Sequence, residues 1–174
     1  MPSPTDRTYY QYQLLRKVRF TPIIQWLYAI LGFIACAAAI WTDSLSGLLY
    51  VILAWVVLNW LHYVIARSIF LMDRYTYRKR WGFQWRLPWI GFLPLEHQYV
   101  GFRYWRKILL LQLAISFIII ALLIPWVPIG LTLQLLFWQV WLMGPRVYAM
   151  VSALFIHDDK LIKFESQEFM IYKA

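Results

Sequence analysis

Residues 23–40 have the sequence IIQWLYAILGFIACAAAI, an apolar stretch that only Gln25 interrupts. A helix of this length, rising about 1.5 Å per residue, nearly crosses the roughly 30 Å hydrocarbon core of a bilayer. Trp41 follows directly, and Trp is enriched where a span meets the membrane surface. The stretch also exceeds the roughly 7–15 apolar residues of a secretory signal. It therefore predicts an uncleaved membrane span.

Three further apolar runs follow along the chain, at residues 48–66, 108–124 and 131–156. Two short turns without Lys or Arg join the first run to the second and the third to the fourth, at 42–47 and 125–130. We therefore expect an all-α integral membrane protein with four transmembrane helices arranged as two hairpins.

The expected organisation has five parts. They are a cytoplasmic N-terminal segment (1–21), a first transmembrane hairpin (22–66), a basic aromatic cytoplasmic loop (67–107), a second transmembrane hairpin (108–156) and a cytoplasmic tail (157–174).

The composition supports a membrane protein and excludes other classes. Hydrophobic residues make up 62% of the 174, and only 14% are charged, whereas a soluble domain has roughly 45–50% apolar and about 25% charged residues. Disordered chains are poor in aromatic residues, which here reach 20%. The single cysteine excludes a disulfide scaffold.

The distribution of Lys and Arg predicts the orientation. Four of the 17 lie in segment 1–21, nine in 67–107, three in the tail and one, Arg146, inside the fourth run. The two connecting turns contain none. Because cytoplasmic loops carry the excess of Lys and Arg, we expect both termini and the central loop to lie in the cytoplasm of a multi-pass protein of the cell membrane.

The central loop is the candidate partner-binding region. Its basic and aromatic residues that we select are Arg74, Arg78, Lys79, Arg80, Trp85 and Arg86. One interpretation is that these charges fix the orientation of the chain in the membrane and attract anionic lipid, worth about 1 kcal/mol per cation. The other is a docking patch for a protein, or a direct contact with nucleic acid.

The aromatic part of this loop, residues 81–96, also has two interpretations. Two prolines and two glycines argue against one long helix. Trp and Arg together are typical of a segment lying among lipid headgroups. The same residue types are also the anchors of protein interfaces.

Small residues recur every three or four positions in the first run, at Ala29, Gly32, Cys36 and Ala39. In lipid such stripes let helix backbones approach closely. We expect a packing face against another helix or against a second copy of the chain in a homo-oligomer.

Polar residues inside the expected spans are rare enough to single out. Those that we select are Asn59, His62, Gln112 and Gln139, together with the Pro145–Arg146 pair. Hydrogen bonds between helices are one explanation, and a polar path through the bundle is the other. Arg146 either extends to the inner headgroups or makes a charged contact at the proline kink. A small transporter or lipid-interacting membrane protein is therefore the alternative function.

Enzyme chemistry has little support in the sequence. The chain lacks a phosphate-binding Gly-rich loop, a Gly-x-Ser-x-Gly motif and a His-Glu-x-x-His motif. Its histidines are scattered, and the pairs Glu96–His97 and His157–Asp158 cannot complete a metal site alone. We expect a non-enzymatic protein without a metal or cofactor.

Three stretches carry a resemblance to a known family: Tyr9 to Phe20, Trp85 to Leu95, and Pro145 to Lys160. Together they resemble the TcpE-like family of small membrane proteins from conjugative elements of Gram-positive bacteria, chiefly over residues 85–164. The resemblance implies a membrane subunit of a type IV secretion-like conjugation machine. Such subunits hold a cytoplasmic ATPase and other channel subunits at the membrane, and the family brings no catalytic residues.

Overall fold

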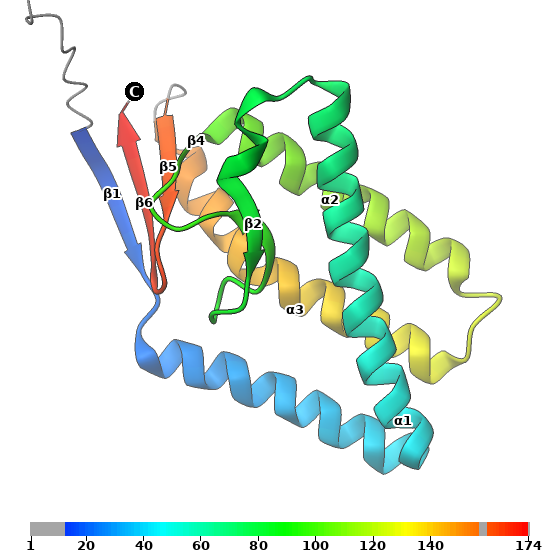
Figure 1. Ribbon diagram of the computed structural model, residues 1–174. Coiled ribbons are helices and arrows are strands. Elements are labelled where there is room, and N and C mark those ends of the chain that lie inside the picture. The colour runs from blue at the N-terminus through cyan, green and yellow to red at the C-terminus, as the bar shows by residue number, and fades with distance from the viewer. Residues whose placement is uncertain (1–12, 157–159, 174) are drawn as a thin grey trace, which may run out of the picture.

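The computed structural model describes residues 13–156 and 160–173. Within them, the fold consists of three α-helices, one 3-10 helix and six short strands (Figure 1). The helices are α1 (Pro22–Met72), α2 (Phe102–Leu123) and α3 (Ile129–Leu154), with a 3-10 helix η1 (Thr76–Arg80). The strands are β1 (Gln13–Arg19), β2 (Trp81–Gln84), β3 (Gly91–Pro94), β4 (Tyr99–Gly101), β5 (Lys160–Phe164) and β6 (Glu168–Lys173).

The strands form two antiparallel sheets. The larger has the order β1-β6-β5-β4 and so joins the two ends of the described chain to its centre. The smaller is the hairpin of β2 and β3, in which Trp81 faces Pro94 and Gln84 faces Gly91.

Helix α1 turns a corner at Ser44. Its backbone there has φ 52° and ψ −129°, outside the helical region, so α1 consists of a first arm (22–43) and a second arm (45–72). Gly47 lies against the Ala39 carbonyl, where a side chain would clash. Gly130, at the start of α3, faces Asp43 and Tyr50. The corner and the α2–α3 turn therefore lie at one end of the molecule, away from the larger sheet (Figure 1).

Aromatic side chains join the larger sheet to the helices. Trp89, Trp105, Phe164 and Phe169 are at most 1% exposed, and their ring centroids lie 5.0–6.3 Å apart. Burial alternates along β5, as expected of a strand with one covered face. A second apolar cluster, which includes Ala54, Leu58, Ile120 and Leu142, lies between the three helices.

The prediction of an all-α protein with four transmembrane helices is wrong. Residues 13–156 and 160–173 form three α-helices and two sheets. The first two apolar runs lie in α1, which leaves helical geometry only at Ser44. Parts of the expected cytoplasmic segments 1–21, 67–107 and 157–174 form strands. Their backbone groups gain hydrogen-bond partners in two local hairpins, β2–β3 and β5–β6, and in the distant pairings β1–β6 and β4–β5.

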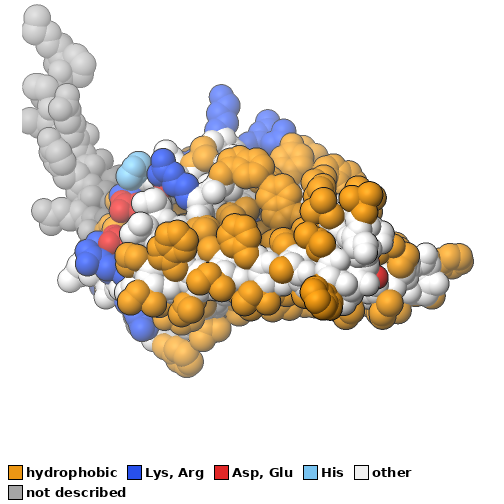
Figure 2. Space-filling model, turned by 90° about the horizontal axis from the view of Figure 1, so that it is seen from below, with side chains coloured by type: hydrophobic (Ala, Val, Ile, Leu, Met, Phe, Trp, Pro, Cys, Tyr) orange, Lys and Arg blue, Asp and Glu red, His pale blue; other side chains and the backbone are white. Residues whose placement is uncertain are grey.

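Helices α1 and α2 are long and apolar enough to cross a membrane. Only 11% of the most apolar window of α1, and 28% of that of α2, is buried, whereas the core helix of a soluble protein is covered by its neighbours. Figure 2 shows the result on one face: hydrophobic side chains cover most of it, and charged ones gather near the sheet end.

Candidate functional site

Two exposed cations of the central segment, Arg74 and Arg78, line a hollow beside the end of α1. We call it the basic hollow; its volume is about 450 Å³ and its walls are Phe70, Leu71, Arg74, Tyr75, Thr76 and Arg78. Arg74 and Arg78 are exposed, as is neighbouring Lys79. Burial and nearby Tyr77 raise the pKa of Tyr75, although Trp81 and Arg80 oppose this. The phenol in this wall therefore stays neutral, and the guanidinium groups determine the charge of the hollow.

Arg80 is partly buried and contacts other parts of the chain, whereas the neighbouring Arg78 and Lys79 are exposed. Its Nη1 donates to the Tyr99 carbonyl at 2.9 Å, and its guanidinium carbon lies 4.2 Å from the centre of the Tyr77 ring. The side chain thus ties η1 to β4.

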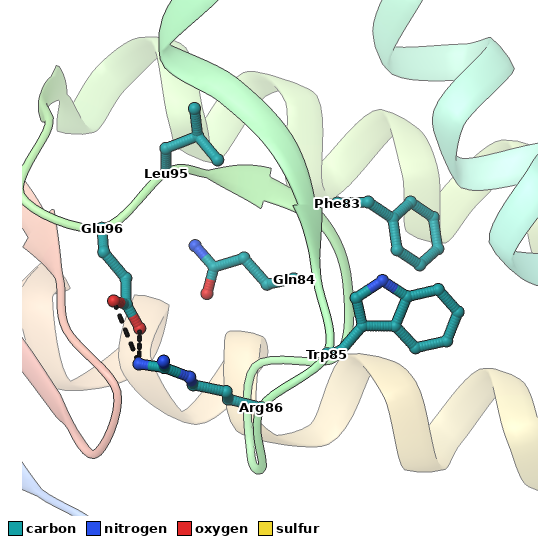
Figure 3. Close-up of a pocket in the computed structure, with 6 residues that line it drawn as sticks. All are labelled: Phe83, Gln84, Trp85, Arg86, Leu95 and Glu96. Carbon is teal, nitrogen blue, oxygen red and sulfur yellow. Dashed lines mark hydrogen bonds and ion pairs between the residues drawn. The ribbon is translucent and has the colours of Figure 1, made fainter.

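Trp85 and Arg86 line a different hollow, of about 410 Å³, beside the β2–β3 hairpin where the connecting loop leaves β2 (Figure 3). Arg86 Nη1 donates to both carboxylate oxygens of Glu96, at 3.1 and 3.2 Å. Trp85 is 67% exposed and lies near Phe83 and Trp55, with ring centroids 5.0 and 5.6 Å away. Of the six selected residues, Arg74 and Arg78 therefore line one hollow, Trp85 and Arg86 line another, and Lys79 and Arg80 line neither.

The tip of the β2–β3 hairpin is enclosed by the helices. Trp89 is fully buried, and the Arg146 Nη2 of α3 donates to the Ile90 carbonyl at 2.6 Å. Gly91 has φ +109°, and a Cβ there would meet Arg146 Nη2 and Asn59 Oδ1. Only part of the aromatic segment is therefore available to headgroups or to a partner.

Arg146 is 1% exposed. Its Nη2 bonds to the Ile90 carbonyl inside the fold, so the interpretation of Arg146 as an anchor to the headgroups is wrong. The contact beside Pro145 is with the backbone of the loop between β2 and β3. Its Nε and Nη1, like Asn59 Oδ1, have no protein partner among the described residues.

Three of the other selected polar residues, His62, Gln112 and Gln139, take part in hydrogen bonds between helices. His62 Nε2 of α1 lies 3.0 Å from Gln139 Oε1 of α3, and Gln112 Nε2 of α2 donates to the His62 carbonyl at 2.9 Å. Asn59 instead donates to Trp55 in its own helix. All four are at most 4% exposed. These contacts favour helix packing over a polar path.

The small-residue stripe faces α3 and the hairpin tip. A Cβ on Gly32 would lie 3.4 Å from the Trp141 ring, and Tyr28 stacks on the same ring with centroids 4.1 Å apart. Ala39 is buried. Ala29, Gly32 and Cys36 also line an apolar hollow of about 300 Å³ together with Trp85 and Trp138.

Sequence reasoning did not identify three charged residues that connect elements. Lys160 is 3% exposed, and its Nζ donates to the Ala153 and Ile156 carbonyls at the end of α3. A lysine just after a helix is a known C-terminal signal. Glu168 pairs with Lys17 and Arg19 of β1 at 2.5 and 2.7 Å, and Asp73 pairs with Lys107 at 2.7 Å. These contacts depend on the tertiary fold.

Residues 13–156 and 160–173 contain no group of three or more His, Cys, Asp or Glu side chains that could hold a metal. The His157–Asp158 pair lies outside the described residues. Models of protein families, curated proteins and solved structures were all compared with this chain, and none of them matches.

Proposed function

We propose that the chain is a multi-pass protein of the cell membrane, with its strands on the cytoplasmic side. We further propose that it is a non-enzymatic subunit of a type IV secretion-like conjugation machine, where it holds a cytoplasmic ATPase and other channel subunits. The resemblance over residues 85–164 is the reason for proposing a conjugation machine and an ATPase as the partner. The structure supplies the arguments for how such a subunit would work.

The observation that carries the proposal is the separation of charge from apolar surface. Every described Lys and Arg except Arg146 lies in a strand, in η1, in a loop beside them or near the helix ends that adjoin them. The opposite end, residues 41–48 and 123–131, has no Lys or Arg and one carboxylate, Asp43. This asymmetry is the one expected of a protein whose basic end faces the cytoplasm.

The basic hollow is the part of this end best suited to a partner. Arg74, Arg78 and Lys79 are exposed, and Phe70 and Tyr75 provide apolar wall beside them. Guanidinium groups beside aromatic rings are typical anchors of protein interfaces. An acidic side chain of the ATPase, entering between Arg74 and Arg78, is the contact that we expect.

Charge reversal tests the docking. Arg78→Glu and Lys79→Glu should each lower co-purification of the conjugation ATPase, expressed in the same cells, about fivefold, because a surface charge contact is worth up to about 1 kcal/mol. Lys173→Glu makes the same charge change at the exposed end of β6 and should have no effect. Equal recovery of the ATPase with all three variants would contradict the docking surface.

A further inference from the structure

A second hollow lies between the second arm of α1 and α2. We call it the interhelix groove; its volume is about 430 Å³. Its walls are two rows of apolar residues at helical spacing, Leu61, Ile65 and Ile69 from α1 and Leu111, Ile115 and Ile119 from α2. Ser68, the one uncharged polar residue of its lining, is exposed on the α1 side.

The groove has one charged end. Asp73 and Lys107 belong to its lining, and Lys107 Nζ lies 2.7 Å from Asp73 Oδ2. Arg74, next to Asp73, is exposed. Two cations, Lys107 and Arg74, therefore lie at the same end as one carboxylate, and an anion placed there meets a positive field.

The shape of the groove suits a slender apolar chain. From Lys107 to Ile119, α2 rises about 18 Å, and the lining along that length is apolar. A helix about 10 Å wide and equally long fills more than roughly 1,000 Å³, far above the volume of the groove. The volume does fall within the roughly 300–1,000 Å³ of small-molecule sites.

We propose that the interhelix groove binds one acyl chain of an anionic phospholipid, whose phosphate lies at Lys107. This inference rests on the proposed membrane orientation, which puts the charged end of the groove at the cytoplasmic leaflet. Anionic lipids give that leaflet its negative potential, and basic pockets between spans bind their headgroups. The bound lipid fills the space between α1 and α2 beside the Asp73–Lys107 ion pair.

Native mass spectrometry of the purified full chain in detergent tests the proposal. The probes are phosphatidylglycerol and phosphatidylcholine with identical acyl chains. We expect at least fivefold more bound phosphatidylglycerol at equal lipid concentration. Equal binding of the two lipids would overturn the proposal, because it would indicate lipid held without selection for charge.

Two variants with matched controls locate the site. Ser68→Phe fills the groove from an exposed position and should lower phosphatidylglycerol binding to the phosphatidylcholine level, while Ala37→Phe, on the exposed first arm, should not. Lys107→Gln should weaken the selection several-fold, and Lys79→Gln should leave it unchanged. Undiminished binding by a folded Ser68→Phe variant would overturn the assignment.

A cross-linking measurement covers the case in which Ser68→Phe does not fold. Phosphatidylglycerol with a photoreactive acyl chain should label the unmodified protein in residues 61–73 and 107–119. Label spread evenly over α1 to α3 would overturn the proposal. Since both measurements use the isolated chain, a failure of ATPase docking leaves their outcome unaffected, and the reverse also holds.

Discussion

Gly91 is the residue on which the enclosed hairpin tip depends. Its φ of +109° is open to glycine and strained for other residues. The space where its side chain would lie is filled by Arg146 Nη2 and Asn59 Oδ1. Glycine therefore allows the Ile90 carbonyl to reach Arg146, and this bond connects the hairpin to α3.

Gly91→Ala should lower the free energy of unfolding by roughly 1–3 kcal/mol, because it adds backbone strain and displaces Arg146. Gly144→Ala is the matched control, since a Cβ there meets nothing within 4 Å. In a helix, alanine is more stable than glycine by about 1 kcal/mol. Pro145 follows directly, and its ring clashes with the Cβ of a preceding helical residue, so the two effects offset each other and the free energy of unfolding should change little. Unfolding in detergent micelles measures both. Equal stability of the two variants would show that the tip does not depend on Gly91.

At this scale, the sequence revealed which polar residues to examine but not their partners. Asn59, His62, Gln112 and Gln139 stand out because polar residues are rare in apolar runs. The bond from His62 to Gln139 spans 77 residues, and no local pattern encodes it. The anchor interpretation of Arg146 failed because distance along a helix does not give the direction of a side chain.

The sheets are the elements that the sequence did not predict. β1 pairs with β6, so Arg19 lies opposite Glu168, and β4 pairs with β5. Such pairings need partners from distant segments, and short strands give weak local signals. The apolar runs were recognised because a long apolar helix is determined by its own residues. The corner at Ser44 lies within the expected turn at 42–47, but helical geometry continues on both sides of it, so the first two apolar runs belong to one helix.

Glu168 gives β1 a pH-dependent attachment. Hydrogen bonding from Lys17, reinforced by its charge and by Arg19, lowers the pKa of Glu168 below its ordinary 4.5. A carboxylate with a depressed pKa stabilises the fold fully above its unfolded pKa, and this contribution is lost as pH falls through the folded pKa. The attachment of β1 should therefore weaken below about pH 4.5, the unfolded value.

Amide hydrogen exchange of β1, corrected for intrinsic rates, measures this effect. Between pH 6 and pH 3 the unmodified chain should lose protection in β1. Glu168→Gln removes the carboxylate, so its β1 should be less protected at pH 6 and change little at pH 3. The same pH response in both proteins would rule out Glu168 as the cause.

At the scale of the whole molecule, one end is cationic and partly built of strands, and apolar side chains cover most of the face drawn in Figure 2. The sequence predicted separate basic segments at this end. The structure shows that β1, β4, β5 and β6 join parts of these segments in one sheet. The proposed docking and lipid sites both lie toward this end, beside the last turns of α1. Their roles therefore share one requirement, that this end faces the cytoplasm.

Cysteine labelling in intact cells tests that orientation most directly. Replacing the single cysteine, Cys36, by alanine gives a background for Trp126→Cys, at an 84% exposed position in the α2–α3 turn, and for Lys79→Cys, at the exposed basic end. With a membrane-impermeant maleimide, our account predicts labelling of the Trp126→Cys variant in intact cells and of the Lys79→Cys variant only after permeabilisation. Labelling of the Lys79→Cys variant in intact cells would contradict it.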